Sequence, residues 1–292
     1  MTLWNQYHLA RSVNDALEAL AAPGTARLIG GGTDLLLDLQ QGRHPPVQTL
    51  IDVTAIPEMA ALEIRGNSLY IGAAVPLNRV VADPAVSQHA EALYEAAGLI
   101  GGPQVRNTAT LGGNVAHALP AADGTIALLA LDAEAEIASL QGRIRKPLRE
   151  LFQGPGRSAL DPRLELLVGF YLPLSAPRQG SAFRRVMRPQ GVAIAILNLA
   201  AWVQRTEDRV QDIRLSIGPA GPTPLRLCGA ENVLRGQRLD EQSLDQAAQA
   251  LMEEARFRTS PHRSTAEYRR HMARILLEQT LAAAFQRAGA AG

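Results

Sequence analysis

The stretch RNTATLGGNVAHALPAAD, residues 106–123, places two adjacent glycines in an apolar segment and ends on a carboxylate before a second apolar run. Gly112 and Gly113 are followed directly by Asn114. Glycine loses more backbone entropy on folding than any other residue, so adjacent glycines in an ordered segment require a compensating role. Close approach of a ligand to the main chain is one such role, because no side chain stands in the way.

A second segment, LIGGGTDL at 28–35, has the same organisation. Both segments place glycines after an apolar strand, follow them with a short polar residue and precede a predicted helix. Consecutive main-chain N–H groups at a helix start bind anionic oxygens such as those of phosphate. Either loop alone also fits an ordinary glycine turn. Two loops closing on one dinucleotide would supply the many contacts that a tightly bound cofactor needs.

Neither common nucleotide-binding fingerprint is present. Lys146, the only lysine, stands between Arg145 and Pro147, which excludes a P-loop. Gly30 and Gly32 fit the start of the Rossmann pattern, but Leu35 occupies the position of its third glycine.

Residues 1–56 predict a small α/β unit. ARLIGGG at 26–32 predicts a short buried strand that runs into the glycines. The helix that follows has Thr33 or Asp34 as its N-cap. A second strand, TLIDV at 49–53, completes a strand, helix and strand arrangement.

From residue 57 the pattern changes. LEIRGNSLYIG at 62–72 alternates apolar and polar residues on both sides of a Gly-Asn pair, which is typical of a β-hairpin. Asp83 followed by proline predicts the start of a helix that runs to about Gly98. TIALLALDAEAEI at 125–137 predicts a buried helix that leads into a strand.

PLSAPRQG at 173–180 has the composition of a linker. We therefore predict two domains, residues 1–175, with subdomains of about 1–56 and 57–175, and residues 176–292. In the second domain, 192–204 and 210–217 are strand candidates, and two helices are predicted to end the chain. The second of these helices begins at a capping box, Ser264–Glu267.

Composition excludes several classes of protein. The formal net charge of +1 gives no global field for nucleic acid or an anionic membrane surface. No uncharged apolar run reaches the roughly 18 residues that cross a bilayer, and the first residues lack the features of a signal peptide. We therefore expect a cytoplasmic protein. Cys228, the only cysteine, excludes an internal disulfide and a cysteine-held metal or cluster, and we expect it to be a small buried hydrophobic residue.

LIGGGTDLLLDLQQG at 28–42 and GGPQVRNTATLGGNVAHALPAADGTIALLALDAEAEI at 101–137 resemble the FAD-binding medium subunit of the molybdenum hydroxylases. That family contains xanthine dehydrogenase, carbon monoxide dehydrogenase and 4-hydroxybenzoyl-CoA reductase. The resemblance continues in family order through IGPAGPTPLR at 217–226 and RSTAEYRRHMARILLEQTL at 263–281. It implies an α+β fold: a two-subdomain FAD-binding unit, with a small α/β lobe and a mixed α/β lobe, then a C-terminal α+β subdomain with an antiparallel sheet and helices.

The resemblance also implies which residues contact FAD. The two glycine loops would hold the diphosphate through main-chain amides and the Thr110 and Asn114 side chains. Asp123 would contact sugar or sugar-alcohol hydroxyls, with a helix N-cap as its alternative role. The implied cofactor-binding residues are Leu28, Ile29, Gly30, Gly31, Gly32, Thr33, Asp34, Leu35, Ile100, Gly101, Thr110, Gly112, Gly113, Asn114 and Asp123.

Several positions stay open, and no catalytic residue or metal ligand is assigned. Arg106 fits either a phosphate partner or a structural turn, and His117 fits either local packing or the cofactor edge. Many relatives carry a lysine and an aspartate near the flavin in the third subdomain. The corresponding stretch, SAFRRVMRPQGVA at 181–193, has no aspartate, so the resemblance gives no flavin potential or electron acceptor. It offers Arg184, Arg185 and Arg188 instead.

The implied function is electron transfer within a multi-subunit oxidoreductase. FAD would be the redox centre, and the partners would be a small subunit with two [2Fe-2S] clusters, a large molybdopterin subunit and an external acceptor such as NAD, dioxygen or a quinone. Two alternatives are a stand-alone FAD-dependent oxidoreductase and a flavin-free assembly subunit. Both glycine loops are intact, which disfavours the assembly subunit.

Overall fold

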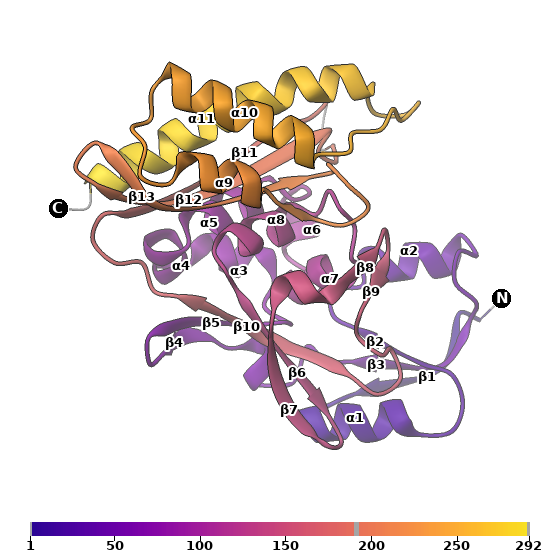
Figure 1. Ribbon diagram of the computed structural model, residues 1–292. Helices are drawn as coiled ribbons and strands as arrows, with labels where there is room; N and C mark the ends of the chain where they lie inside the picture. The colour runs from indigo at the N-terminus through magenta and orange to yellow at the C-terminus, as the bar shows by residue number, and fades with distance from the viewer. Residues whose placement is uncertain (1, 190–192, 291–292) are drawn as a thin grey trace.

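The computed structural model describes residues 2–189 and 193–290. Its first part is a small lobe with a parallel sheet of order β1-β3-β2 (Figure 1). The elements of this lobe are β1 (Trp4–Leu9), α1 (Val13–Ala21), β2 (Ala26–Ile29), α2 (Leu35–Gln40) and β3 (Val47–Asp52). The predicted α/β unit is confirmed and has one more strand, β1, at the edge of its sheet.

The second lobe is built on a five-stranded antiparallel sheet of order β4-β5-β10-β6-β7. Its strands are β4 (Leu62–Arg65), β5 (Ser68–Gly72), β6 (Glu134–Ser139), β7 (Gly142–Pro147) and β10 (Leu166–Pro173). The hairpin predicted at 62–72 is confirmed, with Arg65 opposite Ser68. Short elements complete this sheet: 3-10 turns at Glu58–Ala60 and Leu148–Leu151, and the small strands β8 (Phe152–Gly154) and β9 (Arg157–Ser158).

Helices of the second lobe connect its strands. They are α3 (Leu77–Ala82), α4 (Pro84–His89), α5 (Glu91–Leu99), α6 (Pro103–Arg106), α7 (Leu111–Ala116) and α8 (Asp123–Ala130). The single helix predicted from Asp83 to Gly98 is wrong, because Ala90, at φ −141° and ψ 50°, leaves the helical conformation between α4 and α5. Asp83 does cap α4 as predicted, accepting from the N–H of Ala85 at 2.8 Å. The predicted helix and strand at 125–137 are confirmed as α8 and β6.

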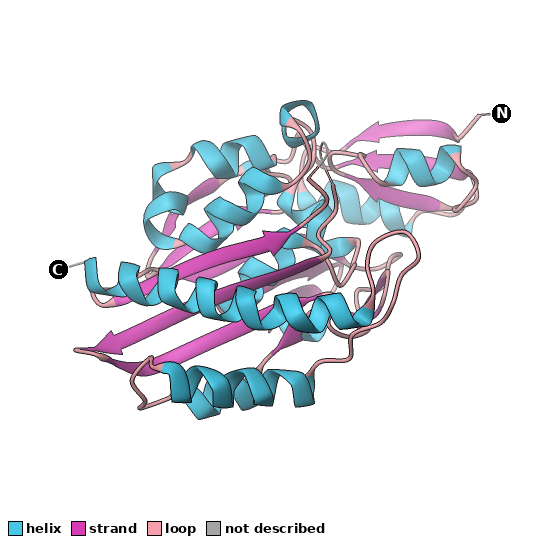
Figure 2. Ribbon diagram, turned by 90° about the horizontal axis from the view of Figure 1, so that it is seen from above, coloured by secondary structure: helices cyan, strands magenta, loops and turns pink. Residues whose placement is uncertain are grey.

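The C-terminal part has an antiparallel sheet of order β11-β12-β13-β14 between two helical layers. Its elements are β11 (Gln179–Val186), β12 (Leu197–Thr206), β13 (Arg209–Gly218), β14 (Leu225–Arg226), α9 (Cys228–Leu234), α10 (Glu241–Glu254) and α11 (Ala266–Ala290). Helix α11 lies over one face of this sheet and runs roughly along its strands (Figure 2), and α5 and α8 pack on the opposite face. Successive side chains of β12 point to opposite faces of the sheet, so helices can pack on both faces. Leu199 belongs to the C-terminal core, and Trp202 belongs to the core of the second lobe.

Some predictions for this part are wrong. Three helices rather than two follow β14. The capping box at Ser264 does not form, because Thr265 accepts the N–H of Tyr268 at 3.1 Å and caps α11. Cys228 is exposed rather than buried. The first residue of the 192–204 strand candidate lies outside the described residues, and β12 begins at Leu197.

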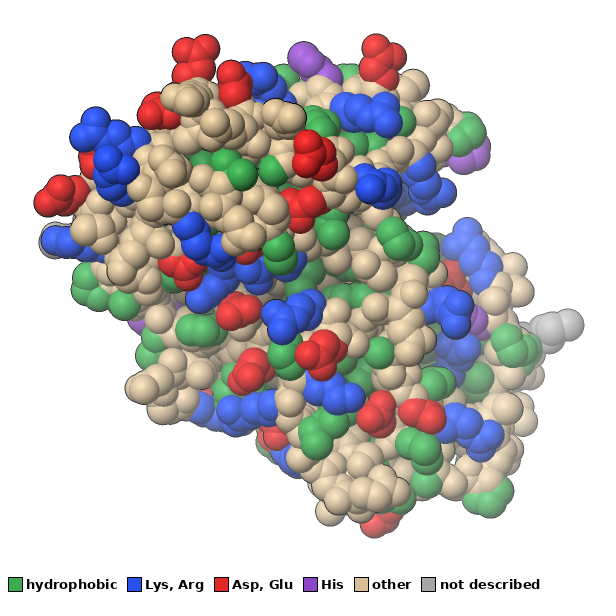
Figure 3. Space-filling model, viewed as in Figure 1, with side chains coloured by type: hydrophobic (Ala, Val, Ile, Leu, Met, Phe, Trp, Pro, Cys, Tyr) green, Lys and Arg blue, Asp and Glu red, His purple; other side chains and the backbone are tan. Residues whose placement is uncertain are grey.

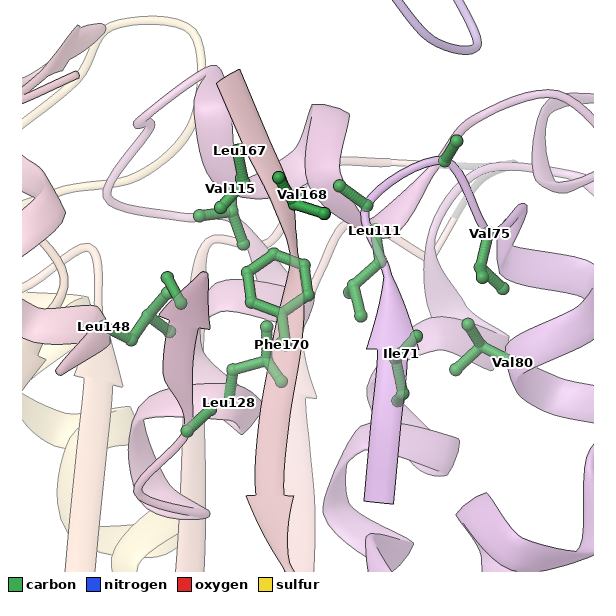
Figure 4. Packing of buried hydrophobic residues seen from close by; sticks show 14 of the residues in the cluster. Ile71, Val75, Val80, Leu111, Val115, Leu128, Leu148, Leu167, Val168 and Phe170 are labelled. Carbon is green, nitrogen blue, oxygen red and sulfur yellow. The ribbon is translucent and has the colours of Figure 1, made fainter. Parts of the chain in front are cut away.

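Most of the buried hydrophobic residues that the structure describes lie in two cores, and a third, small cluster is formed by Ile29, Val47 and Leu50 in the first lobe. The larger core spans both N-terminal lobes, and Figure 4 shows Phe170 of β10 packed among residues that include Leu128 of α8 and Val115 of α7. The other core lies between the C-terminal sheet and its covering helices. The domain boundary after residue 175 stays a prediction; it falls between the end of β10 and the start of β11.

Candidate functional site

The two glycine loops contact each other where the first lobe meets the second. A Cβ atom on Gly31 would lie 1.9 Å from the carbonyl oxygen of Thr108. A Cβ atom on Gly30 would lie 3.0 Å from Thr110 Oγ1. The two loops, far apart in sequence, therefore form one continuous surface, and Gly31 is required for the main chains to approach so closely.

The first loop presents a run of unpaired N–H groups. Among the residues that the structure describes, none accepts a hydrogen bond from the main-chain N–H groups of residues 30–35. Gly32 has φ +69°, a left-handed conformation that glycine adopts without steric cost. Thr33 and Asp34 are exposed, so this part of the loop is open to solvent. Successive free N–H groups of this kind form a concave site for anionic oxygens.

The second loop differs, because its N–H groups are already paired. Helix α7 begins directly after Thr110, and the protein itself accepts each N–H from 111 to 114. The bonds are Leu111 N–H to the Val75 carbonyl (3.1 Å), Gly112 N–H to the Ala73 carbonyl (2.9 Å), Gly113 N–H to Thr110 Oγ1 (3.0 Å) and Asn114 N–H to the Thr110 carbonyl (3.1 Å). These four N–H groups are therefore engaged within the protein, and their expected contact with phosphate oxygens stays a prediction. Gly112 makes room for backbone instead, since its Cβ would lie 2.5 Å from the Ala73 carbonyl oxygen.

The second loop can bind a ligand through the side chains of Thr110 and Asn114. Thr110 Oγ1 accepts from Gly113 and keeps its own hydroxyl hydrogen available. Asn114 Oδ1 accepts the N–H of Thr125 at 3.1 Å, which ties α7 to α8 and fixes the amide. Within the described part of the chain the Asn114 Nδ2 group donates to no residue. Gly113 is exposed between these two side chains, and its Cβ would meet only Thr110 Oγ1, at 3.2 Å.

Ile100 and Gly101 form the turn between α5 and α6. Gly101 has φ +58°, and Arg106 Nη1 donates to the carbonyl oxygens of Ile100 at 3.2 Å and of Gly101 at 2.7 Å. Of the two roles open for Arg106, the structure shows the structural turn.

An ion pair joins the two loops. Asp34 is the N-cap residue of α2, as predicted, but its side chain makes no capping hydrogen bond. Its Oδ2 instead lies 3.5 Å from Nδ1 of His117, the residue that follows α7. The imidazolium of His117 lowers the pKa of the Asp34 carboxyl, and the carboxylate raises the pKa of His117. Of its two open roles, His117 therefore fits the edge of the loop site rather than packing alone.

This pair predicts a pH-dependent contribution to stability. Because the pKa of His117 is raised in the folded state, its contribution is fully present below the unfolded value of about 6.5 and is lost as pH rises through the folded pKa. The Asp34 contribution is present above the unfolded value of about 3.9 and is lost as pH falls through the lowered folded pKa. Asp34 is 63% exposed, so we expect about 0.2–1 kcal/mol at pH 6. Urea unfolding of wild type and His117→Gln at pH 6 and pH 8.5 measures it; an identical pH response in both proteins would contradict the pair.

Asp123 bonds to residues of the C-terminal sheet. It is 5% exposed at the start of α8, and its Oδ2 accepts from Arg185 Nη1 at 2.5 Å while Oδ1 accepts from Asn198 Nδ2 at 2.6 Å. Burial raises the pKa of the Asp123 carboxyl, and the Arg185 charge opposes that rise. Each oxygen accepts one hydrogen bond within the protein, and the expected contact with cofactor hydroxyls stays a prediction. The N-cap alternative is wrong, because Ala122 holds that position.

Arg184, Arg185 and Arg188 have separate partners and do not form one cationic site. Arg184 pairs with Glu95 of α5 at 2.7 Å, and Arg287 of α11 pairs with the same carboxylate at 2.8 Å. Arg188 donates to the carbonyl oxygen of His262. Sequence reasoning missed Asn198, whose signal was a lone polar residue within an apolar strand.

Comparison with known proteins decides the family. Residues 4–175, more than half of the chain, match the family model of the FAD binding domain in molybdopterin dehydrogenase. The chain belongs to this family. Residues 181–284 match the CO dehydrogenase flavoprotein C-terminal domain, so both parts of the FAD-binding medium subunit are present in order.

Relatives resemble the chain along almost its whole length. The putative xanthine dehydrogenase FAD-binding subunit of Escherichia coli is 31% identical, over 97% of this chain and 97% of the relative. The 6-hydroxypseudooxynicotine dehydrogenase complex subunit alpha of Paenarthrobacter nicotinovorans is 34% identical, over 97% and 95%. The solved carbon monoxide dehydrogenase of Hydrogenophaga pseudoflava has a chain with a TM-score of 0.91 and 30% identity, over 97% of both chains.

FAD is the cofactor of this FAD-binding family, and the first loop fits it. The free N–H groups of residues 30–35 suit a diphosphate, and the narrow contact at Gly31 holds this cradle against the second loop. Along residues 2–189 and 193–290, no helix combines the length and the apolar character needed to cross a bilayer. In the same ranges no three histidine, cysteine or acidic side chains gather as a metal site.

Proposed function

We propose that the chain is the electron-transfer subunit of a molybdenum-containing hydroxylase or dehydrogenase complex. It would receive electrons from the iron–sulfur clusters of a partner and pass them through FAD to an external acceptor. The observation that supports this role is the run of unpaired N–H groups at 30–35, held against the second glycine loop at the junction of the two lobes. Bound FAD supplies the redox chemistry, accepting and releasing electrons.

We propose that the chain contributes binding and orientation through the two loops. The N–H groups of residues 30–35 would hold the diphosphate, with Leu28 and Ile29 as the strand end that positions them. The Thr110 hydroxyl and the Asn114 amide would donate from the second loop, across the exposed backbone of Gly113. Ile100 and Gly101 would form the turn beside the flavin. In this arrangement Asp123 would also set the position of the C-terminal domain, through Arg185 and Asn198.

The partners in this proposal are a small subunit with two [2Fe-2S] clusters and a large molybdopterin subunit. A single cysteine does not ligate such a cluster, so electrons reach the flavin from another chain. The relatives named as a FAD-binding subunit of xanthine dehydrogenase and as subunit alpha of a dehydrogenase complex support this assignment. A cytoplasmic location is part of the same proposal.

Purification of the chain from its own cells tests the function. We expect a flavin absorption spectrum, together with iron and molybdenum that elute with the chain. A chain without flavin would indicate the assembly subunit. A flavin-containing chain that elutes alone and oxidises a substrate by itself would indicate the stand-alone oxidoreductase.

Gly113→Val tests the loop assignment. The new side chain meets little of the protein, because a Cβ there touches only Thr110 Oγ1, so the fold is expected to persist. It would instead occupy the exposed surface between Thr110 and Asn114, and flavin retention should be abolished. Flavin absorbance after gel filtration and far-UV circular dichroism give the two readouts; unchanged flavin content in the folded variant counts against the assigned loop.

A further inference from the structure

Arg269 is buried at the start of α11 without a counter-charge. It lies in the first turn of that helix and is 2% exposed, the largest of the fully buried side chains. It belongs to the same helix face as the core residues Ala273, Leu276 and Leu277, which pack on the C-terminal sheet. A guanidinium enclosed in this way is costly unless it is paired and hydrogen-bonded.

No carboxylate side chain of this chain balances Arg269. In the described ranges its side chain takes part in no ion pair and no hydrogen bond, and its Nε is buried without a partner. The residues outside those ranges are Met1, Gln190, Gly191, Val192, Ala291 and Gly292, none of them acidic. Burial lowers the pKa of Arg269, and the charges of Arg263 and Arg258 lower it further. The surroundings of Arg269 are therefore positive as well as poorly solvated.

The adjoining segment is strongly basic. Residues 256–271 contain five arginines and two histidines but only one acidic residue, Glu267, whereas the whole chain has a formal net charge of +1. Arg258 is exposed and Arg263 is half-buried, so both are within reach of solvent. Figure 3 shows Lys, Arg and His side chains at the upper right of the molecule, where α11 begins in Figure 1.

The start of α11 adds to the positive potential. A helix of 25 residues carries a partial positive charge at its N-terminus, which disfavours an arginine there and favours an anion. Thr265 and Thr259 accept the N–H groups of Tyr268 and Ala266, so this end is ordered. A guanidinium presents N–H donors in a planar fork that matches phosphate oxygens.

We propose that Arg258, Arg263 and Arg269 form a binding site for a phosphate-type oxyanion at the start of α11. The anion balances the charge of the buried Arg269 guanidinium. Arg258 and Arg263, which are more exposed, attract the anion from solvent. The site is separate from the glycine loops, since Figure 1 places the start of α11 at the top of the molecule, apart from α2 and α7. Its ligand is therefore a phosphate group other than the FAD diphosphate.

Thermal unfolding of the flavin-loaded protein with inorganic phosphate tests the site. At constant ionic strength, phosphate at about 100 times its Kd should raise the wild-type Tm by about 5 °C. Arg269→Met should unfold at or above the wild-type Tm without phosphate, because a costly buried charge is gone, and should show no phosphate response. Arg270→Met, the exposed neighbour on the same helix, is the matched control and should behave as wild type. Arg258→Met should weaken the response and leave the phosphate-free Tm unchanged.

Three results would overturn the proposal. An equal phosphate response in wild type and Arg269→Met would mean that phosphate acts through general exclusion from the surface. A lower Tm of Arg269→Met without phosphate would mean that Arg269 is satisfied within the protein. Loss of flavin absorbance in Arg269→Met would mean that the anion is the FAD diphosphate. Failure of the proposed electron-transfer role leaves these readouts unchanged, because phosphate binding is measured without turnover.

Discussion

Gly31→Ala is expected to weaken FAD binding by about ten- to a hundredfold. The added methyl group would lie 1.9 Å from the carbonyl oxygen of Thr108 and 2.5 Å from its carbonyl carbon. Neither is the end of a flexible side chain, so the two main chains must separate. Overpacking of this kind costs about 1–3 kcal/mol, and each 1.4 kcal/mol is about tenfold in affinity. The affinity for FAD decreases because the unpaired N–H groups of residues 30–35 would move away from the second loop.

Fluorescence titration of the deflavinated chain with FAD measures this effect. Gly98→Ala is the matched control, because Gly98 lies within α5 and nothing is within 4 Å of its Cβ position. Alanine is also the better helix former, so that variant should bind FAD as wild type does. If Gly31→Ala binds FAD with wild-type affinity while folded, the loop contact does not support the cofactor site.

Local chemistry in the sequence predicts the elements and the first loop well. The strand before Gly30, the hairpin at 62–72 and the cap at Asp83 depend on residues that are neighbours in the chain, so short patterns are sufficient to find them. The unpaired N–H groups of the first loop are also predictable from local sequence, because glycines between a strand and a short helix leave few nearby acceptors for these groups.

The features that local sequence patterns do not predict depend on hydrogen-bond and ion-pair partners far away in the chain. The second loop has the same glycine pattern as the first, yet carbonyls at Ala73 and Val75, on the segment after β5, accept two of its N–H groups. Asp34 is of a residue type that caps helices, but its carboxylate pairs with His117 and makes no hydrogen bond to the N–H groups of α2. In both cases a residue with an adequate local role has a stronger partner in another element, and a local pattern contains no information about it.

Asp123 is the clearest example, and Asp123→Asn is expected to lower the free energy of unfolding by about 3–5 kcal/mol. The aspartate and Arg185 are 62 residues apart and 6% and 5% exposed as side chains. Removing one partner of such a pair leaves a buried charge uncompensated, which accounts for the size of the loss. Asn198 does not replace the missing charge, because it carries only an amide. Urea denaturation measures the change in midpoint and slope.

A double variant distinguishes the cost of leaving one buried charge without its partner from the net contribution of the ion pair to stability. Asp123→Leu combined with Arg185→Met replaces both charges by apolar side chains and should recover most of the stability, since an apolar substitute for a buried ion pair is often neutral or stabilising. The cluster already contains two buried atoms without partners in the described structure, Arg185 Nε and Asn198 Oδ1, which makes the native pair less favourable than its short distances suggest. Glu278→Gln, which removes an exposed pair with Arg274 on α11, is the surface control and should cost no more than about 0.5 kcal/mol. If Asp123→Asn costs no more than this control, the aspartate is not the buried connection between the second lobe and the C-terminal sheet.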